Sequence, residues 1–283
     1  MVQSSPSDLV ALSMSAPYDD TFTSDGFGMT IDGVELAAPL QQLARGVLPN
    51  GVAVLAGSNL DEGTEFMSEA FPIECNASAA ELLSWSVLQF GPVLGPQVGP
   101  AYAAASLEAP FPRCYDQQHH HHGAGPPPPP PPPTTTEWVS AMRAAGDAAI
   151  GCRARELLYA ARRAGSDQFR YLFTVQPNVS VNWPPGTLEY EGAFHGAEVP
   201  FVFNDLFELS GPGERQAASA MGCWWTNFAA TGNPNVGPTG CAAGLPEWPV
   251  SGAGGDAMVI TNTTLGKRSA VKKVACDIFS KFA

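Results

Sequence analysis

The stretch "GVAVLAGSNLDEG", residues 51–63, decides the fold class of this chain. An apolar run at Val52–Ala56 is bounded by glycines, which predicts a buried strand leading into a loop. Glu62 stands in that loop directly after the strand, where α/β proteins place functional groups. The segment therefore predicts a sheet strand whose following loop carries a carboxylate.

Helical and strand patterns alternate on the C-terminal side of this stretch. "QFRYLFTV" (168–175) alternates and is rich in aromatic residues, and "AMVIT" (257–261) is a shorter apolar run, so both predict strands. Helical patterns cover residues 66–110, in pieces interrupted by prolines, and residues 137–165. Strands separated by helices favour an α/β layer architecture.

A longer helical pattern follows in "ERQAASAMGCWWTNFAATG", residues 214–232. Its apolar residues fall on one stripe, so Trp224 and Trp225 are expected in the core, and Gly232 ends the helix. Two further amphipathic helices are predicted, one near "APLQQLARG" (38–46) and one at the end of the chain.

Composition excludes several classes of partner. The 283 residues suffice for one large domain or two small ones. With 27 acidic and 14 basic residues the net charge is −13, so we expect neither nucleic acid nor an anionic membrane surface as a partner. There is no apolar run long enough for a membrane span. The first residues, "MVQSSPSDLVALSMSAP", lack the basic and apolar regions of a signal peptide.

Cysteines and sequons point to an oxidising compartment. The chain has six cysteines and no CxxC spacing that would indicate a zinc site. We expect no other metal site and no cofactor. Glycosylation sequons stand at Asn76, Asn178 and Asn262. The even cysteine count and the sequons together favour a secretory setting, which conflicts with the absent signal peptide.

Residues 117–136, "QQHHHHGAGPPPPPPPPTTT", are of low complexity. Eight consecutive prolines favour an extended polyproline II segment, which cannot belong to a packed core. We interpret 117–136 as a surface insertion within the domain. The run His119–His122 offers no surrounding groups to organise a functional metal site.

His195, in "EYEGAFHGAEVPFVFN" (189–204), is the one credible general base outside that run. A hydrolytic triad needs a nucleophile, a base and an acid that orients the base. Gly192 and Gly196 allow the backbone to turn sharply around His195, and Glu62 is a candidate acid. From the residues alone, a structural histidine and an ordinary turn at Glu62 remain open alternatives.

Three motifs in order resemble the type-B carboxylesterase and cholinesterase family: "VAVLAGSNLDEGTEF", "YEGAFHGAEVPFVF" and "WWTNFAATGNPN". The resemblance implies an α/β-hydrolase fold in which Glu62 is the acid and His195 the base of the triad. It also implies that Glu198 contacts the triad without belonging to it. An ordinary surface carboxylate at Glu198 is an equal alternative. The implied substrate is a small-molecule ester.

The resemblance covers residues 1–283 as the C-terminal part of a carboxylesterase type-B domain, a partial sheet with packed helices. The nucleophile of this fold precedes the acid, yet no serine before Glu62 stands in G-x-S-x-G, and no HGG-type segment supplies an oxyanion hole. We therefore expect a fragment that lacks the N-terminal half, the nucleophile elbow and the serine. Such a chain should be inactive and poorly soluble alone, with Met1 an internal or mis-assigned start.

The resemblance also implies a disulfide between Cys152 and Cys276 that attaches the last helix. The remaining cysteines, Cys75, Cys114, Cys223 and Cys241, are paired as Cys223–Cys241 and Cys75–Cys114 only by elimination, and this pairing stays open. The family is largely secretory, so the parent protein is expected to be secreted. Loss of the natural N-terminus would explain the missing signal peptide.

Two other functions compete with the esterase hypothesis. The first is a non-catalytic cholinesterase-like adhesion or binding module, against which the retention of Glu62 and His195 argues. The second is a cytosolic interaction protein whose proline tract, residues 126–133, binds SH3- or WW-type grooves. In the esterase hypothesis, a partner chain or an upstream segment supplies the N-terminal half.

Overall fold

The computed structural model describes residues 33–34, 51–64, 73–103, 107, 112, 134–178, 192–204, 209 and 211–280. The chain divides into two compact units, Met1–Val47 and Leu48–Ala283. Of the first unit only Gly33 and Val34 are described, and all the helices and strands described belong to the second. The helix expected at 38–46, most of the insertion at 117–136 and Cys114 lie outside the described residues.

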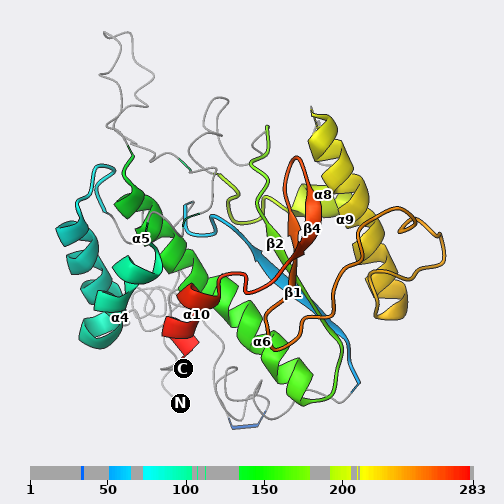
Figure 1. The fold of residues 1–283 in the computed structure, drawn as a ribbon, viewed down its shortest axis with the longest axis horizontal. Helices are drawn as coiled ribbons and strands as arrows, with labels where there is room; N and C mark the ends of the chain where they lie inside the picture. Colours follow the sequence, from blue (N-terminus) through cyan, green and yellow to red (C-terminus); the bar gives the residue numbers. More distant parts are fainter. Residues whose placement is uncertain are drawn as a thin grey trace, which may run out of the picture. The chain divides into compact units, whose positions relative to one another are not determined.

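A four-stranded mixed sheet forms the centre of the second unit (Figure 1). Its strands, in spatial order, are β1 (Val54–Asn59), β2 (Gln168–Phe173), β3 (Ala257–Ile260) and β4 (Leu265–Arg268). The first three run parallel, and β4 pairs antiparallel with β3. Asn59 lies opposite Phe173, so β1 and β2 end together and their following loops start at the same edge of the sheet.

Seven helical segments pack around the sheet in the described part of the chain. They are α4 (Ala79–Ala101), α5 (Thr136–Gly146), the π-helical turn η3 (Asp147–Gly151), α6 (Cys152–Arg163), α8 (Val199–Phe203), α9 (Pro212–Thr231) and α10 (Lys273–Ser280). α5, η3 and α6 follow one another directly and form one long helical segment (Figure 1). None of the helices described is long and apolar enough to cross a bilayer.

Alternation along β2 puts helices on both faces of the sheet. Phe169 and Phe173 belong to a core cluster that also holds Phe201 of α8 and Met221 and Trp224 of α9. Leu172, which points the other way because strand side chains alternate, joins a separate cluster with Ala257, Val259 and Val271. α6 contacts β1 and β2. The described unit is thus an α/β fold with helices on both sides of a partial sheet.

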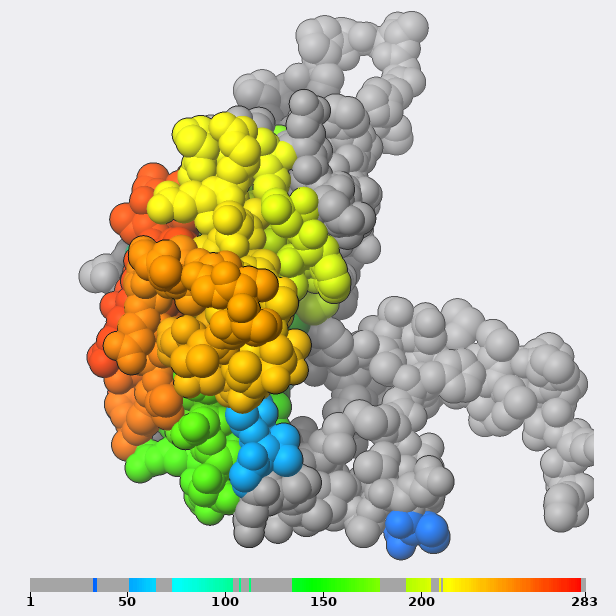
Figure 2. Space-filling model, turned by 90° about the vertical axis from the view of Figure 1, so that its right-hand side faces the viewer, coloured from blue at the N-terminus to red at the C-terminus, as the bar shows by residue number. Residues whose placement is uncertain are grey.

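α9 and the loop after it form one outer face of the unit. Figure 2 shows α9 in yellow and the loop, residues 232–250, in orange beside it. Gly232 ends α9 in the left-handed conformation, as expected from the sequence. The disulfide Cys223–Cys241 ties this loop to α9. Trp224 is completely buried and Trp225 packs against the same cluster, which confirms their expected place in the core.

A second core cluster joins α4, α5 and α10 on the other side of the molecule. It contains Trp85, Trp138, Met142 and Phe279, and the disulfide Cys152–Cys276 crosses it. This bond attaches α10 to the start of α6, as the family resemblance implies. Cys75 is also disulfide-bonded, and its expected partner Cys114 lies outside the described residues.

Several element boundaries differ from the sequence-based expectation. The first strand occupies Val54–Asn59 rather than Val52–Ala56, because backbone pairing with β2 continues past the apolar run. The interruption in α4 lies at Gly91, which has φ 79°, whereas Pro96 and Pro100 lie within the helix. Pro92 directly follows this break, in the first turn of the second half, where a missing N–H removes no helical hydrogen bond, whereas Pro96 and Pro100 each lack an internal N–H donor.

The two described disulfides should contribute unequally to stability. Cys152 and Cys276 are 124 residues apart, and Cys223 and Cys241 are 18 apart. Chain-entropy estimates give losses of about 5 kcal/mol for Cys152→Ala/Cys276→Ala and about 3 kcal/mol for Cys223→Ala/Cys241→Ala. Urea unfolding at neutral pH measures both. A larger loss of unfolding free energy for Cys223→Ala/Cys241→Ala would contradict the expectation that Cys152–Cys276 contributes more to stability.

Candidate active site

Glu62 and His195, which stand far apart in the sequence, lie against each other at the C-terminal edge of the sheet. The Oε2 atom of Glu62 is 2.7 Å from Nδ1 of His195, and Oε1 accepts a hydrogen bond of 2.6 Å from the backbone N–H of Asn59. A carboxylate oxygen at this distance is an acceptor for an Nδ1–H group, so the contact favours the tautomer of His195 that carries its proton on Nδ1. The Glu62 side chain is 5% exposed and that of His195 41%, so a buried acid holds an accessible imidazole.

Glycines shape the loop that carries His195. Gly192 has φ 64° and Gly196 has φ 85°, both in the left-handed region that favours glycine. A Cβ atom on Gly192 would also lie 2.4 Å from Oδ2 of Asp61, a distance that side chains do not tolerate. The expectation that glycines let the backbone turn around His195 is therefore confirmed at both positions.

Asn59 connects the loop that carries Glu62 (residues 60–64, called the acid loop below) to Glu198. Its Nδ2 donates hydrogen bonds to the carbonyl of Phe194, at 2.7 Å, and to Oε2 of Glu198, at 2.5 Å. The hydroxyl of Tyr171 donates to the other oxygen of Glu198 at 3.4 Å. Glu198 thus approaches the Glu62–His195 pair through Asn59, which is completely buried.

Burial dominates the electrostatics around Glu198. It raises the pKa of Glu198, against the lowering effect of the hydrogen bond from Asn59, and the charge of nearby Glu62 adds to the increase. Burial also raises the pKa of Tyr171, and the charges of Glu198 and Glu62 raise it further. The Tyr171 hydroxyl is therefore a donor here and not an acid.

A buried lysine fixes the start of the acid loop. Nζ of Lys272 donates to the carbonyl of Asn59, at 3.1 Å, and forms an ion pair of 2.5 Å with Asp147 of η3. The Tyr102 hydroxyl donates to the other oxygen of Asp147, at 2.9 Å, and burial raises the pKa of this hydroxyl well above its usual range. The π-helical turn thereby connects the long helix to the end of β1.

α5 packs directly against the residues that carry Glu62. A Cβ on Gly63 would lie 2.1 Å from the carbonyl of Met142, and one on Gly146 would lie 2.6 Å from the backbone nitrogen of Gly63. Asp61 forms a buried ion pair with Arg143 of the same helix, 2.8 Å between Oδ1 and Nε. Two glycines and one ion pair therefore seat the acid loop on α5.

Sequence reasoning missed most of these supporting residues. Asn59 and Asp61 stand in the same short segment as Glu62, and their position was the available signal. Arg143 and Lys272 are remote in the chain, and nothing in the sequence links them to the loop.

The sequon asparagines are the remaining candidate residues. Asn76, Asn178 and Asn262, the asparagines of the sequons, are exposed. Within the described ranges, no group of three or more His, Cys, Asp or Glu side chains is arranged to hold a metal ion.

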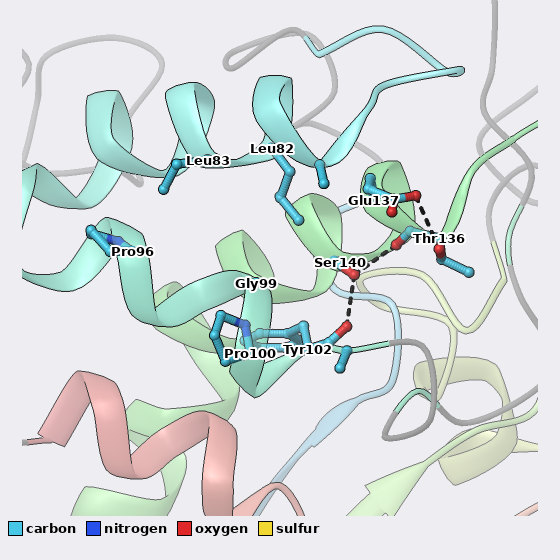
Figure 3. A pocket seen from close by; sticks show the side chains of 11 residues that line it. Leu82, Leu83, Pro96, Gly99, Pro100, Tyr102, Thr136, Glu137 and Ser140 are labelled. Atoms are coloured by element: carbon cyan, nitrogen blue, oxygen red, sulfur yellow. Dashed lines mark hydrogen bonds between the residues drawn. The ribbon is translucent and has the colours of Figure 1, made fainter.

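A pocket of about 430 Å³ lies between the two halves of α4 and the first turn of α5 (Figure 3). Apolar residues form most of its wall, and Glu137 and Ser140 contribute polar groups. The Ser140 hydroxyl is engaged with the carbonyls of Thr136, at 2.6 Å, and Tyr102, at 2.9 Å. Glu62 and His195 are not part of this pocket, so we do not assign the site's chemistry to it.

Residues 130–279 match the model of the Carboxylesterase family. The chain is 32% identical to acetylcholinesterase 1 of Caenorhabditis briggsae over 108 residues, 36% of this chain and 17% of the relative. It is 32% identical to the acetylcholinesterase of Electrophorus electricus over 129 residues, 43% of this chain and 20% of the relative. With the liver carboxylesterase of Sus scrofa it shares 32% identity over 143 residues, 49% of this chain and 24% of the relative.

The family match extends over more than half of the chain, which therefore belongs to the carboxylesterase family. This membership implies an α/β-hydrolase fold, with which the mixed sheet and its covering helices agree. The aligned part of the chain spans only 17–24% of the length of these three relatives.

Adding a methyl group at Gly146 should disturb the acid loop. In Gly146→Ala the new Cβ would meet Gly63 and Glu62, so we expect a loss of about 1–3 kcal/mol in the free energy of unfolding. Gly99→Ala in α4 is the matched control, since nothing lies within 4 Å of its Cβ position, and it should gain about 0.5–1 kcal/mol from helix propensity. Urea unfolding measures both, and a Gly146→Ala variant as stable as the wild type would contradict the packing described.

Glu198→Gln should change how stability depends on pH. Burial raises the pKa of Glu198 above its ordinary 4.5. Between these two values the folded protein binds more protons at this carboxyl than the unfolded chain does, so the contribution of Glu198 to stability falls as the pH rises. The free energy of unfolding of Glu198→Gln minus that of the wild type should therefore increase as the pH rises from 4.5 through the raised pKa of Glu198. If this difference in unfolding free energy instead fell as the pH rises, the prediction would be wrong.

Proposed function

We propose that this chain carries the acid and the base of a Ser-Glu-His triad of a carboxylic-ester hydrolase, with Glu62 as the acid and His195 as the base. The observation that supports it most is the contact of 2.7 Å between the buried Glu62 carboxylate and Nδ1 of the accessible His195 ring. Membership of the carboxylesterase family gives the reaction class, and the substrate class is a small-molecule ester.

In the proposed mechanism Nδ1 of His195 keeps its proton throughout, while Nε2 first accepts a proton and then donates it. The Nδ1 proton stays on the hydrogen bond to Glu62, which leaves Nε2 to accept the proton of a serine hydroxyl. The serine attacks the ester carbonyl, and protonated His195 then donates its Nε2 proton to the leaving alcohol. Glu62 orients the ring and stabilises the imidazolium while remaining ionised.

The serine and the oxyanion hole are proposed to come from a polypeptide segment outside this sequence. Two features support this. Among the described residues, β1 pairs with β2 alone, so its outer edge can accept another strand. On α8, directly after the His195 loop, Val199 is 40% exposed and Phe203 is 67% exposed, although both are large and apolar. An added strand beside β1 would place its following elbow at the edge where Glu62 and His195 lie.

On this proposal the chain is the C-terminal part of a carboxylesterase domain, residues 117–136 are an insertion in it, and the isolated chain is inactive. The disulfides and the exposed sequon asparagines support an oxidising, secretory compartment and glycosylation of the parent protein. The adhesion-module alternative has weaker support, because a purely binding role does not require an acid–base pair with triad geometry.

The coding sequence upstream of Met1 tests the proposal first. Translated in frame, it should contain a G-x-S-x-G segment that follows a strand pattern. The joined chain should hydrolyse p-nitrophenyl acetate, whereas residues 1–283 alone should not. Esterase activity of residues 1–283 alone would contradict the assignment of the nucleophile.

Substitutions in the joined chain test the two roles separately. His195→Gln should lower kcat roughly 10⁶-fold and Glu62→Gln roughly 10⁴-fold, because the base acts on the serine directly and the acid acts through the base. Glu247→Gln, at an exposed carboxylate, is the matched control and should retain full activity. A His195→Gln variant with normal kcat would rule out the proposed base.

A further inference from the structure

We propose that Asp61 is a positioning residue of this site: its carboxylate holds the backbone before His195 in register with Glu62, and Arg143 holds that carboxylate in place. This inference rests on the proposed function, because the pair being positioned is the proposed acid and base. It assigns a role to two residues that take no part in the mechanism above.

The first observation is a double attachment between the two loops. The backbone N–H of Asp61 donates to the carbonyl of Ala193 at 3.0 Å, and the N–H of Ala193 donates to Oδ2 of Asp61 at 3.0 Å. Asp61 directly precedes Glu62, and Ala193 stands two residues before His195. A change in either bond is therefore transmitted to the Glu62–His195 contact through very few backbone torsions.

The second observation is that Arg143 fixes the orientation of the Asp61 carboxylate. Nε of Arg143 donates to Oδ1 at 2.8 Å, which leaves Oδ2 directed to the Ala193 amide. The side chains are 3% and 1% exposed, so water cannot replace either bond. Burial raises the pKa of Asp61, and the charge of Arg143 together with the Ala193 hydrogen bond opposes this increase.

The third observation is that Arg143 belongs to the helix that packs against the residues carrying Glu62. It lies in α5, one turn before Gly146, where the helix backbone meets Gly63 without room for a side chain. The same helix thus contacts both Glu62 and Asp61. An ion pair on a mobile surface segment could not transmit this geometry.

The structure also offers a control: a second buried arginine in an ion pair that lacks this connection, although its partner Asp277 is 39% exposed. Arg155 of α6 is 3% exposed and pairs with Asp277 of α10 at 2.9 Å. It also donates to the carbonyl of Lys273 and to Ser280, both at the last helix. Its removal should therefore cost stability without changing the His195 loop.

The tautomer of His195 tests the inference in the full chain. The Glu62 hydrogen bond selects the Nδ1–H tautomer, which long-range ¹H–¹⁵N spectra of ¹⁵N-histidine-labelled protein detect, with His195 assigned through His195→Gln. Two double variants remove both buried charges, since breaking only one side of a buried pair is strongly destabilising. Asp61→Asn/Arg143→Met retains an oxygen that can accept from Ala193, and Asp61→Leu/Arg143→Met does not.

The wild type and the control Arg155→Met should both show the Nδ1–H tautomer. Asp61→Asn/Arg143→Met keeps the acceptor but loses the group that orients it, so it should show an intermediate preference for this tautomer. Asp61→Leu/Arg143→Met should lose it in favour of a mixture of tautomers, while its cooperative unfolding confirms that it is folded. If this variant does not fold, Asp61→Ala/Arg143→Met, which also lacks the acceptor, takes its place with the same expected loss. Retention of the Nδ1–H tautomer in the folded variant without an acceptor would overturn the positioning role.

Glu62→Leu, which removes the acceptor for Nδ1–H altogether, separates failure of this inference from failure of the proposed function. It should abolish the Nδ1–H preference that the wild type shows. If the wild type shows no such preference, the acid–base pair itself is absent, and the proposed function fails together with the inference. If the preference depends on Glu62 but is unaffected by loss of the Asp61 acceptor, only the role of Asp61 is refuted.

Discussion

The main constraint on this structure is the burial of carboxylates at one edge of the sheet. Asp61 and Glu62 are almost completely buried, and an unpaired buried charge is strongly destabilising. Each therefore requires donors with fixed geometry. Asp61 has Arg143 and the Ala193 amide, and Glu62 has the Asn59 amide and His195. Because these donors come from the strand end, α5 and the His195 loop, satisfying the two carboxylates also determines where these parts lie.

The sheet and the long helical segment make this arrangement possible. β1 and β2 are parallel and end together, so the loops that follow them meet at one edge. Behind them, α5 approaches through Gly146, and the π-helical turn presents Asp147 to Lys272, which binds the carbonyl of Asn59. The extra residue of a π-helical turn changes the direction of the side chains after it, and such turns often occur near functional sites. The supporting contacts leave the His195 ring accessible while Glu62 is enclosed.

The sequence allowed the architecture to be predicted more reliably than its details. Three of the four strands and the helix ending at Gly232 followed from apolar periodicity, which reports burial. Backbone pairing is not visible in such a pattern, so β1 was predicted too early: Ser58 and Asn59 are polar but pair with β2. β4 (Leu265–Arg268) is only half-buried or exposed and has no apolar signal, and the five residues of α8 are too few for a helical period.

The residues of the candidate site were likewise predicted only in part. Glu62 and His195 were identified because a family resemblance linked two motifs that periodicity could not connect. Arg143 could not be found in this way, since its ion pair with Asp61 depends on how α5 packs across the end of β1, 82 residues away in the chain. Local sequence patterns carry no information on such long-range pairings between charged groups. They emerge only when the tertiary packing is known.

Native-state hydrogen exchange at the backbone amides of Asn59 and Ala193 tests this account most directly. Both amides donate to buried carboxylates, Asn59 to Glu62 and Ala193 to Asp61. Neither amide forms a helix or an interior strand pair through this bond, yet both should exchange as slowly as the amides of the central strand β2. The bond from Ala193 joins the two loops directly, and the acceptor of the Asn59 amide, Glu62, is held by His195 of the other loop. Exchange of either amide at the rate of an unstructured peptide would show that the carboxylates do not hold the loops together.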